Sequence, residues 1–132
     1  MELSGISFNI RCCDDSNGNA ISERAPRLNE AVSPYDADLI GFQEYTPGWE
    51  EYIKQYFGEK YDMFNKYRAE ENLESTPVLW KKSKFNCIKT GYFWLSDTPE
   101  VRATSVPGNP ENSAVLPCGI LRNCGCRSPQ RY

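Results

Sequence analysis

The sequence predicts an α/β (α+β) domain in which strands and amphipathic helices alternate before several further strands follow. Three observations carry this prediction. Apolar residues alternate with polar ones over residues 3–10, which is the period of a strand, and residues 37–42 form an apolar strand expected to be covered on both faces. Residues 49–57 repeat apolar side chains at helical spacing. The chain of 132 residues is long enough for one domain with a core.

The first elements follow in chain order. The strand over 3–10 places its apolar residues on one side, and the polar, glycine-bearing segment 11–23 is expected to form a loop. Ser22 is a candidate cap for a short helix that tolerates Pro26 in its first turn. The pair Ser33-Pro34 should end that helix, because the residue before a proline disfavours helical geometry.

A second helix is expected directly after the strand at 37–42. Thr46 is typical of an N-cap and Pro47 of the first helical position. The apolar face of residues 49–57 then continues to Gly58, which is a common helix stop. Further strands are predicted at residues 61–65, 77–82 and 87–96.

Composition and charge limit the classes of function. The formal charge of −3 argues against a basic coat for nucleic acid, but it allows a small phosphate site that carries its own cation. No apolar run approaches the 18 residues of a membrane span, and the N-terminus lacks the pattern of a signal peptide, so a cytoplasmic location is expected. The cysteines are expected to be reduced thiols and not a zinc site, because the chain has no histidine and no paired C-x-x-C. They are Cys12, Cys13, Cys87, Cys118, Cys124 and Cys126.

Two polar residues end the two apolar strands. Asn9 ends the first strand and Glu44 ends the second, so parallel pairing would bring both side chains to one edge of the sheet. A carboxylate beside an amide suits Mg²⁺, which takes oxygen ligands and keeps several waters. The alternative is that Glu44 merely stabilises the helix that starts near Thr46, and spacing alone favours this alternative.

Four segments in order resemble the endonuclease/exonuclease/phosphatase family, which has the DNase I-like fold. They are SFNIR at 7–11, DADLIGFQE at 36–44, residues 67–85 around ESTP, and TGYFWLSDTPE at 90–100. The resemblance covers residues 4 to about 110. It implies the first half of a four-layer α/β/β/α sandwich and a metal-dependent phosphoesterase.

The resemblance also implies roles for individual residues. Glu44 would be the main ligand of Mg²⁺ or Mn²⁺, and Asn9 would contact the scissile phosphate or the metal shell. Glu74 matches the glutamate that orients a catalytic histidine, and Arg68 matches a residue that faces the substrate; the alternative for this pair is a solvated loop. Gln43 is expected to hold its loop by hydrogen bonds. Four aromatic residues are expected to be core and not base-stacking platforms: Trp49, Phe57, Phe93 and Trp94.

The sequence departs from the family pattern in two ways. The family's second half supplies catalytic histidine and aspartate residues, whereas this chain contains no histidine, so it is expected to be inactive alone. Residues 1–117 are therefore interpreted as an N-terminal portion of the family domain. Residues 118–132 contain no acidic residue, and they are interpreted as an atypical basic, cysteine-rich tail produced by a frameshift or truncation, or as a linker.

The expected substrate is a phosphate ester, either nucleic acid or a small phosphorylated molecule. The alternatives are a non-catalytic domain that binds metal or phosphate, and a non-functional gene fragment. If half of a sandwich is missing, one sheet face is uncovered and self-association through that face is expected. The apolar residues expected there are Ile6, Phe8, Leu39 and Phe42.

Overall fold

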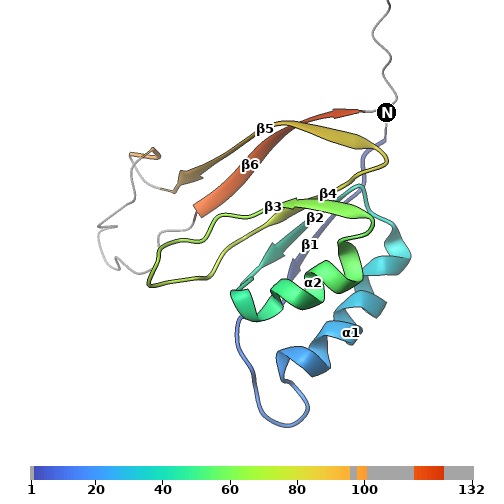
Figure 1. The fold of residues 1–132 in the computed structure, drawn as a ribbon, viewed down its shortest axis with the longest axis vertical. Helices are drawn as coiled ribbons and strands as arrows, with labels where there is room; N and C mark the ends of the chain where they lie inside the picture. The colour runs from blue at the N-terminus through green and yellow to red at the C-terminus, as the bar shows by residue number, and fades with distance from the viewer. Residues whose placement is uncertain (1, 96–97, 101–114, 124–132) are drawn as a thin grey trace, which may run out of the picture.

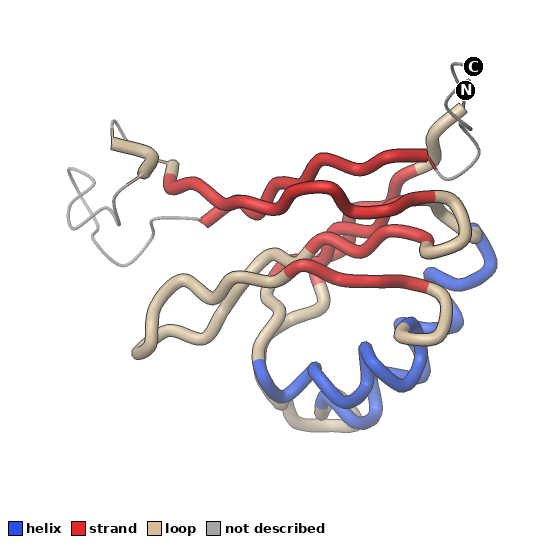
Figure 2. Tube along the Cα trace, turned by 45° about the horizontal axis from the view of Figure 1, so that its top comes forward, coloured by secondary structure: helices blue, strands red, loops and turns tan. Residues whose placement is uncertain are grey.

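The computed structural model describes residues 2–95, 98–100 and 115–123, and within these the predicted α/β fold is confirmed. Figures 1 and 2 show the two helices on one side of a four-stranded sheet and a two-stranded antiparallel sheet on the other side. The layers are therefore helix, sheet and sheet. The strands are β1 (Gly5–Asn9), β2 (Leu39–Gln43), β3 (Tyr61–Phe64), β4 (Val78–Lys81), β5 (Phe85–Trp94) and β6 (Val115–Asn123). The helices are α1 (Ile21–Val32) and α2 (Glu50–Phe57), with short 3₁₀ turns η1 (Ser33–Tyr35) and η2 (Pro47–Trp49).

The larger sheet has the strand order β1-β2-β4-β3. Strands β1 and β2 pair in parallel, with Asn9 opposite Gln43, while β4 runs antiparallel to both of its neighbours. The parallel pair makes the two strands end at the same edge of the sheet. This confirms the prediction that Asn9 and Glu44 lie at one edge of the sheet.

The core lies between the four-stranded sheet and the helices. Ile40 and Phe42 on β2 are 1% and 0% exposed, and they pack with Trp49, Ile53 and Phe57 from the second helix region. The burial of Trp49 and Phe57 confirms that these aromatic residues are core. Helix α1 adds apolar residues to the same cluster: Ile21, Ala25, Leu28 and Val32.

Of the four apolar residues expected to be partly exposed, Ile6, Phe8 and Leu39 are so, whereas the expectation is wrong for Phe42. Phe42 is fully buried, because the parallel register places it beside Phe8 on the face that the helices cover. Phe8 lies on the edge strand β1 and is 38% exposed. The expectation that β2 is covered on both faces was also wrong, since Leu39, Gly41 and Gln43 on its other face are only half-buried.

Helix α1 begins one residue before the predicted cap. The N-cap is Ala20, so Ser22 lies inside the helix and Pro26 lies in its second turn. Two carboxylates replace the missing capping side chain: Glu23 accepts from the Ala20 N–H at 3.1 Å, and Asp14 accepts from the Ile21 N–H at 2.7 Å. The helix ends at Val32 before the Ser-Pro pair, as predicted.

The second helical region follows the prediction more closely. Thr46 is the N-cap residue and Pro47 the first residue of η2, which continues into α2. The Thr46 hydroxyl does not cap the helix but donates to the Cys12 carbonyl at 3.0 Å. Gly58 ends α2 as expected, and a Cβ at this position would lie 2.5 Å from the Lys54 carbonyl oxygen.

Strands β3, β4 and β5 confirm the three strands predicted after the second helix. Strand β6 was not predicted, and its residues 118–123 belong to the segment interpreted as a tail, while residues 124–132 lie outside the described residues. On β5, Trp94 is buried, whereas Phe93 is 38% exposed, so the prediction of a core position is wrong for Phe93. Within the described part of the chain, no helix has both the length and the apolarity needed to cross a membrane.

Candidate functional site

Asn9 and Glu44 are in direct contact at the edge where β1 and β2 end. The Asn9 side-chain Nδ2 donates a hydrogen bond to Glu44 Oε1 at 2.9 Å. Glu44 has a φ of 59°, a left-handed conformation that a non-glycine residue rarely adopts. This turn ends the alternation of β2 and leaves the carboxylate at the strand end instead of in the core.

The second carboxylate oxygen of Glu44 is also held. It accepts the backbone N–H of Cys12 at 3.1 Å and lies 3.9 Å from the Arg11 guanidinium. The hydrogen bond from Asn9, followed by that from the Cys12 amide, keeps the pKa of Glu44 below its ordinary value. The side chain is 30% exposed, so the site presents an ionised, oriented and solvent-accessible carboxylate.

The side-chain amide of Asn9 is itself oriented by the backbone of Arg11. Its Oδ1 accepts the backbone N–H of Arg11 at 3.0 Å, and Arg11 adopts a φ of 64°. The two hydrogen bonds assign the amide orientation, because Nδ2 donates to a carboxylate while Oδ1 accepts from an amide. Asn9 can therefore offer a ligand the second N–H of Nδ2 and the remaining lone pair of Oδ1. The roles of Asn9 in metal or phosphate binding stay predictions.

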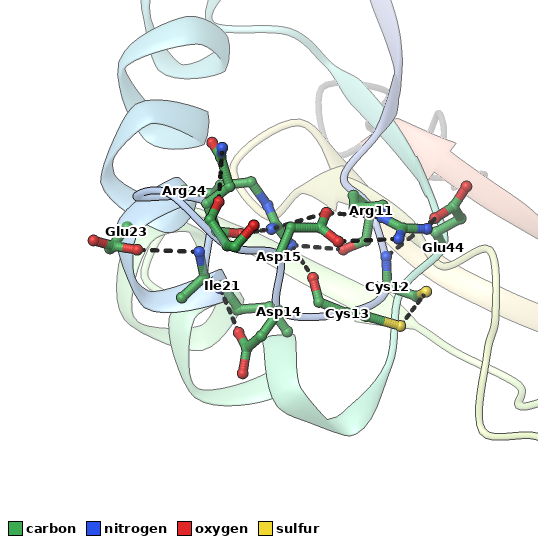
Figure 3. A network of polar contacts seen from close by, with 12 residues as sticks. Arg11, Cys12, Cys13, Asp14, Asp15, Ile21, Glu23, Arg24 and Glu44 are labelled. Carbon is green, nitrogen blue, oxygen red and sulfur yellow. Dashed lines mark hydrogen bonds and ion pairs between the residues drawn. The ribbon is translucent and has the colours of Figure 1, made fainter.

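Arg11 is shared between two carboxylates. Its Nε and Nη2 donate to Asp15 at 3.0 and 3.1 Å, which is closer than its approach to Glu44. This pairing, with Arg24 at 3.8 Å, lowers the pKa of Asp15. Figure 3 shows Arg11 between Asp15 and Glu44 in this network. Asp15 therefore neutralises much of the charge that Arg11 would otherwise place on Glu44.

Arg24 ties the loop that carries the Cys12 amide to helix α1. Its guanidinium donates to the carbonyl oxygens of Arg11 at 3.0 Å, Cys13 at 2.8 Å and Asn19, and lies 5.5 Å from the centre of the Trp49 ring. Trp49 Nε1 also donates to the Arg11 carbonyl at 2.8 Å. Sequence reasoning missed Arg24 and Asp15; the one available signal was the charged, polar loop directly after a strand.

Arg68 and Glu74 form a pair of their own. Arg68 Nη2 lies 3.1 Å from Glu74 Oε1, the two side chains are 20% and 26% exposed, and the Arg68 N–H donates to the Glu74 carbonyl at 3.1 Å. Tyr45 and Ser75 exchange backbone hydrogen bonds of 3.1 and 2.8 Å. Because these two residues directly follow Glu44 and Glu74, the loop that carries Glu74 is fixed beside the end of β2.

Gln43 is held by hydrogen bonds, as predicted from the sequence. Its Nε2 donates to the Ser7 hydroxyl at 3.0 Å and to the Gly41 carbonyl at 3.1 Å. The residue therefore cross-links β1 and β2 immediately before Glu44.

The ligand atoms around Glu44 fit Mg²⁺ or Mn²⁺ better than zinc. No group of three or more His, Cys, Asp or Glu side chains suited to a metal ion occurs within the described ranges. Zinc sites in proteins use about four nitrogen or sulfur ligands, which the surroundings of Glu44 do not offer. Magnesium needs only one or two carboxylates because it retains water. Glu44 therefore fits Mg²⁺ or Mn²⁺ as a one-carboxylate site.

Neither a protein-family model nor a curated protein matches the chain. Solved structures do match. An endonuclease/exonuclease/phosphatase family protein from Bacteroides thetaiotaomicron is 23% identical, with a TM-score of 0.75 over 93% of this chain and 46% of that one. The mannosyl-6-phosphatase of the same organism is 23% identical, with a TM-score of 0.72 over 92% of this chain and 46% of that one. ANGEL2, a 2′,3′-cyclic phosphatase, is 17% identical, with a TM-score of 0.70 over 92% and 37%.

The chain thus spans about half of the length of two of these structures and less of the third. The chain has the DNase I-like fold of endonuclease/exonuclease/phosphatase proteins, over a part of that fold.

Proposed function

We propose that this chain carries the metal-binding part of a phosphoester hydrolase site, with Glu44 as the ligand of Mg²⁺ or Mn²⁺. The observation that supports this proposal best is the Glu44 carboxylate, which is ionised and held by Asn9 and the Cys12 amide at the end of a parallel strand pair. A bound Mg²⁺ would supply Lewis-acid stabilisation of charge on phosphate oxygen.

The residues around Glu44 have separate proposed tasks. Asn9 orients the carboxylate, and its second Nδ2 N–H and the free lone pair of its Oδ1 are available to the scissile phosphate or the metal's water shell. Arg68 uses one nitrogen on Glu74, which leaves other guanidinium N–H groups for phosphate oxygen. Glu74 sets the direction of that guanidinium in the described structure.

The proposed substrate class is a phosphate ester. Two of the similar solved structures are named for phosphatase activity, one on a mannosyl 6-phosphate and one on a 2′,3′-cyclic phosphate. A sugar phosphate and a nucleotide phosphate share the phosphoryl group, which is the part that Glu44 and Arg68 would address. Nucleic acid and small phosphorylated molecules therefore both remain within the proposed class.

We further propose that the 132 residues alone bind the metal without appreciable turnover. The chain contains no histidine, so no imidazole can take or give the proton during attack of water. Glu74, which the resemblance pairs with a catalytic histidine, is instead bound to Arg68. Alignment of water and proton transfer together account for many orders of magnitude in rate.

Titration calorimetry with Mg²⁺ tests the metal proposal. Wild type and the Glu51→Gln variant, in which an exposed carboxylate of α2 is removed, should bind Mg²⁺ weakly and equally. Glu44→Gln keeps the shape of the side chain but loses its charge, and it should lose the binding. Equal Mg²⁺ binding by Glu44→Gln and wild type would refute the metal proposal.

Hydrolysis assays test the second proposal independently. Plasmid nicking and bis-p-nitrophenyl phosphate hydrolysis should show no metal-dependent rate with Mg²⁺ or Mn²⁺. A metal-dependent rate that vanishes in Glu44→Ala would show that these residues suffice for turnover. That result would contradict the absence of turnover while it supported Glu44 as the ligand.

A further inference from the structure

Two thiols lie together beside the Glu44 site. Cys12 and Cys13 are adjacent in the chain, and their sulfur atoms are 2.7 Å apart. Cys13 is exposed and Cys12 is half-buried, and neither is in a disulfide. Figure 3 shows the two sulfur atoms next to one another near the start of the loop that follows β1. The structure thus presents a dithiol from which both sulfur atoms can react with one reagent.

The distance between the Cα atoms of adjacent residues determines how strained a disulfide between Cys12 and Cys13 would be. Consecutive Cα atoms across a trans peptide are about 3.8 Å apart, whereas Cα atoms joined by a disulfide are usually about 4.4–6.8 Å apart. A disulfide between neighbours is therefore strained. Strained or exposed disulfides are readily reduced and belong to the labile, regulatory class. The sulfur atoms of Cys12 and Cys13 can meet, but the bond they form should open easily.

We propose that Cys12 and Cys13 form a redox-active dithiol that low-molecular-weight disulfides oxidise reversibly to a vicinal disulfide. The exposed Cys13 thiolate attacks one sulfur of the reagent, which breaks the reagent's S–S bond and releases one thiol. The Cys12 thiolate then attacks the Cys13 sulfur and releases the second thiol. The two protein thiols lose two electrons and two protons, and the reagent disulfide is reduced to two thiols.

A disulfide between Cys12 and Cys13 would close a ring and affect the hydrogen bonds that anchor the loop after β1. The peptide inside the ring carries the Cys12 carbonyl, which accepts the Thr46 hydroxyl at 3.0 Å, and the Cys13 carbonyl just outside it accepts Arg24 at 2.8 Å. Strain in this peptide should weaken these hydrogen bonds. A bridge between adjacent residues closes almost no loop in the unfolded chain, so it offers little entropic stabilisation in return. The oxidised protein should therefore be less stable than the reduced protein.

Peptide mapping tests the proposal directly. Trypsin cleaves after Arg11 and Arg24, so residues 12–24 form one peptide that contains this pair and no other cysteine. After treatment with oxidised glutathione, we expect this peptide at a mass lower by two hydrogens, and excess reduced glutathione should reverse the change. Two glutathione adducts on the peptide, or no change, would overturn the proposal.

A matched variant and a second readout complete the experiment. In Cys13→Ser, the peptide should carry at most one glutathione on Cys12 and never lose two hydrogens. The same mapping on wild type needs no substitution, so a variant that fails to fold does not weaken the test. The melting temperature of wild type should fall on oxidation, and that of Cys13→Ser should fall less. An equal fall in melting temperature in both proteins would contradict the claim that the disulfide weakens the hydrogen bonds from Thr46 and Arg24. None of these readouts depends on the proposed Mg²⁺ site.

Discussion

Replacement of Arg24 by methionine should destabilise the loop that delivers the Cys12 amide to Glu44. The Arg24 side chain is 16% exposed, and its guanidinium donates to three backbone carbonyl oxygens of the loop that connects β1 with α1. Methionine preserves much of the aliphatic length over Trp49 but provides no donor. The substitution therefore tests the hydrogen bonds more than the packing.

The magnitude follows from the contacts. A hydrogen bond to a charged group contributes about 1.5–3 kcal/mol, and those to Arg11 at 3.0 Å and Cys13 at 2.8 Å are well formed. Loss of the cation over the Trp49 ring, 5.5 Å from its centre, adds about 0.5–1 kcal/mol. Two terms offset these losses: released carbonyls near the surface regain water, and the Arg24 Nε, which is buried without a partner, is removed. We expect a net loss of about 2–4 kcal/mol in the free energy of unfolding.

Urea unfolding followed by circular dichroism measures this loss. Arg27→Met is the matched control, because Arg27 is an exposed arginine one turn later with its own bonds to the carbonyls of Gly18 and Glu23. Its exposed position should limit the loss to about 1 kcal/mol or less. Equal losses in both variants, or a loss under about 1 kcal/mol for Arg24→Met, would refute the argument that Arg24 anchors this loop.

Three further predictions concern charge. Lys84 and the Ser4 amide lower the pKa of the buried Asp38 carboxyl to about 2, so its stabilisation is complete above the unfolded pKa of about 3.9 and is lost as pH falls toward 2. Thermal melts at stepped pH should show this loss in wild type but not in Asp38→Asn. The pKa of Glu44 is also lowered, so its stabilisation should be lost below about pH 4.3, and Glu44→Gln should remove that part of the pH dependence. Arg11→Gln should raise Mg²⁺ affinity by about two- to fivefold in calorimetry, because it removes an exposed cation 3.9 Å from the Glu44 carboxylate. An unchanged affinity would show that Arg11 does not compete with Mg²⁺ for Glu44.

The elements that sequence predicted well are those with a strong local pattern. The apolar residues of α2 recur at helical spacing, so only a helix places all of them on one buried face. Thr46-Pro47 marks where this helical region starts. The contact between Asn9 and Glu44 was predictable for a related reason. Each residue ends an apolar strand, and parallel neighbours finish at one edge. The helix was predictable from its local pattern, and the Asn9–Glu44 contact needed only the further assumption that β1 and β2 pair in parallel.

The errors have a common physical cause, which is that the deciding partner lies elsewhere in the chain. Helix α1 starts after Ala20 because Asp14 supplies an acceptor from the preceding loop, and no rule for capping residues includes such a partner. Phe42 is buried because register places its face under the helices, and alternation alone does not say which face is covered. Strand β6 pairs with β5 although Pro117 and Gly119 weaken its strand pattern.

The same non-local contacts limit what the proposed metal site can bind. Glu44 Oε1 and Oε2 each already accept one hydrogen bond, and Asn9 offers no second carboxylate. A cation here would meet one direct carboxylate ligand and would have to keep most of its water. Calcium takes about 6–8 oxygen ligands in a flexible cage, whereas magnesium holds its waters tightly and accepts sites with one or two carboxylates. The hydrogen bonds that orient Glu44 therefore favour a small, hydrated cation over a larger one, and weak over tight binding.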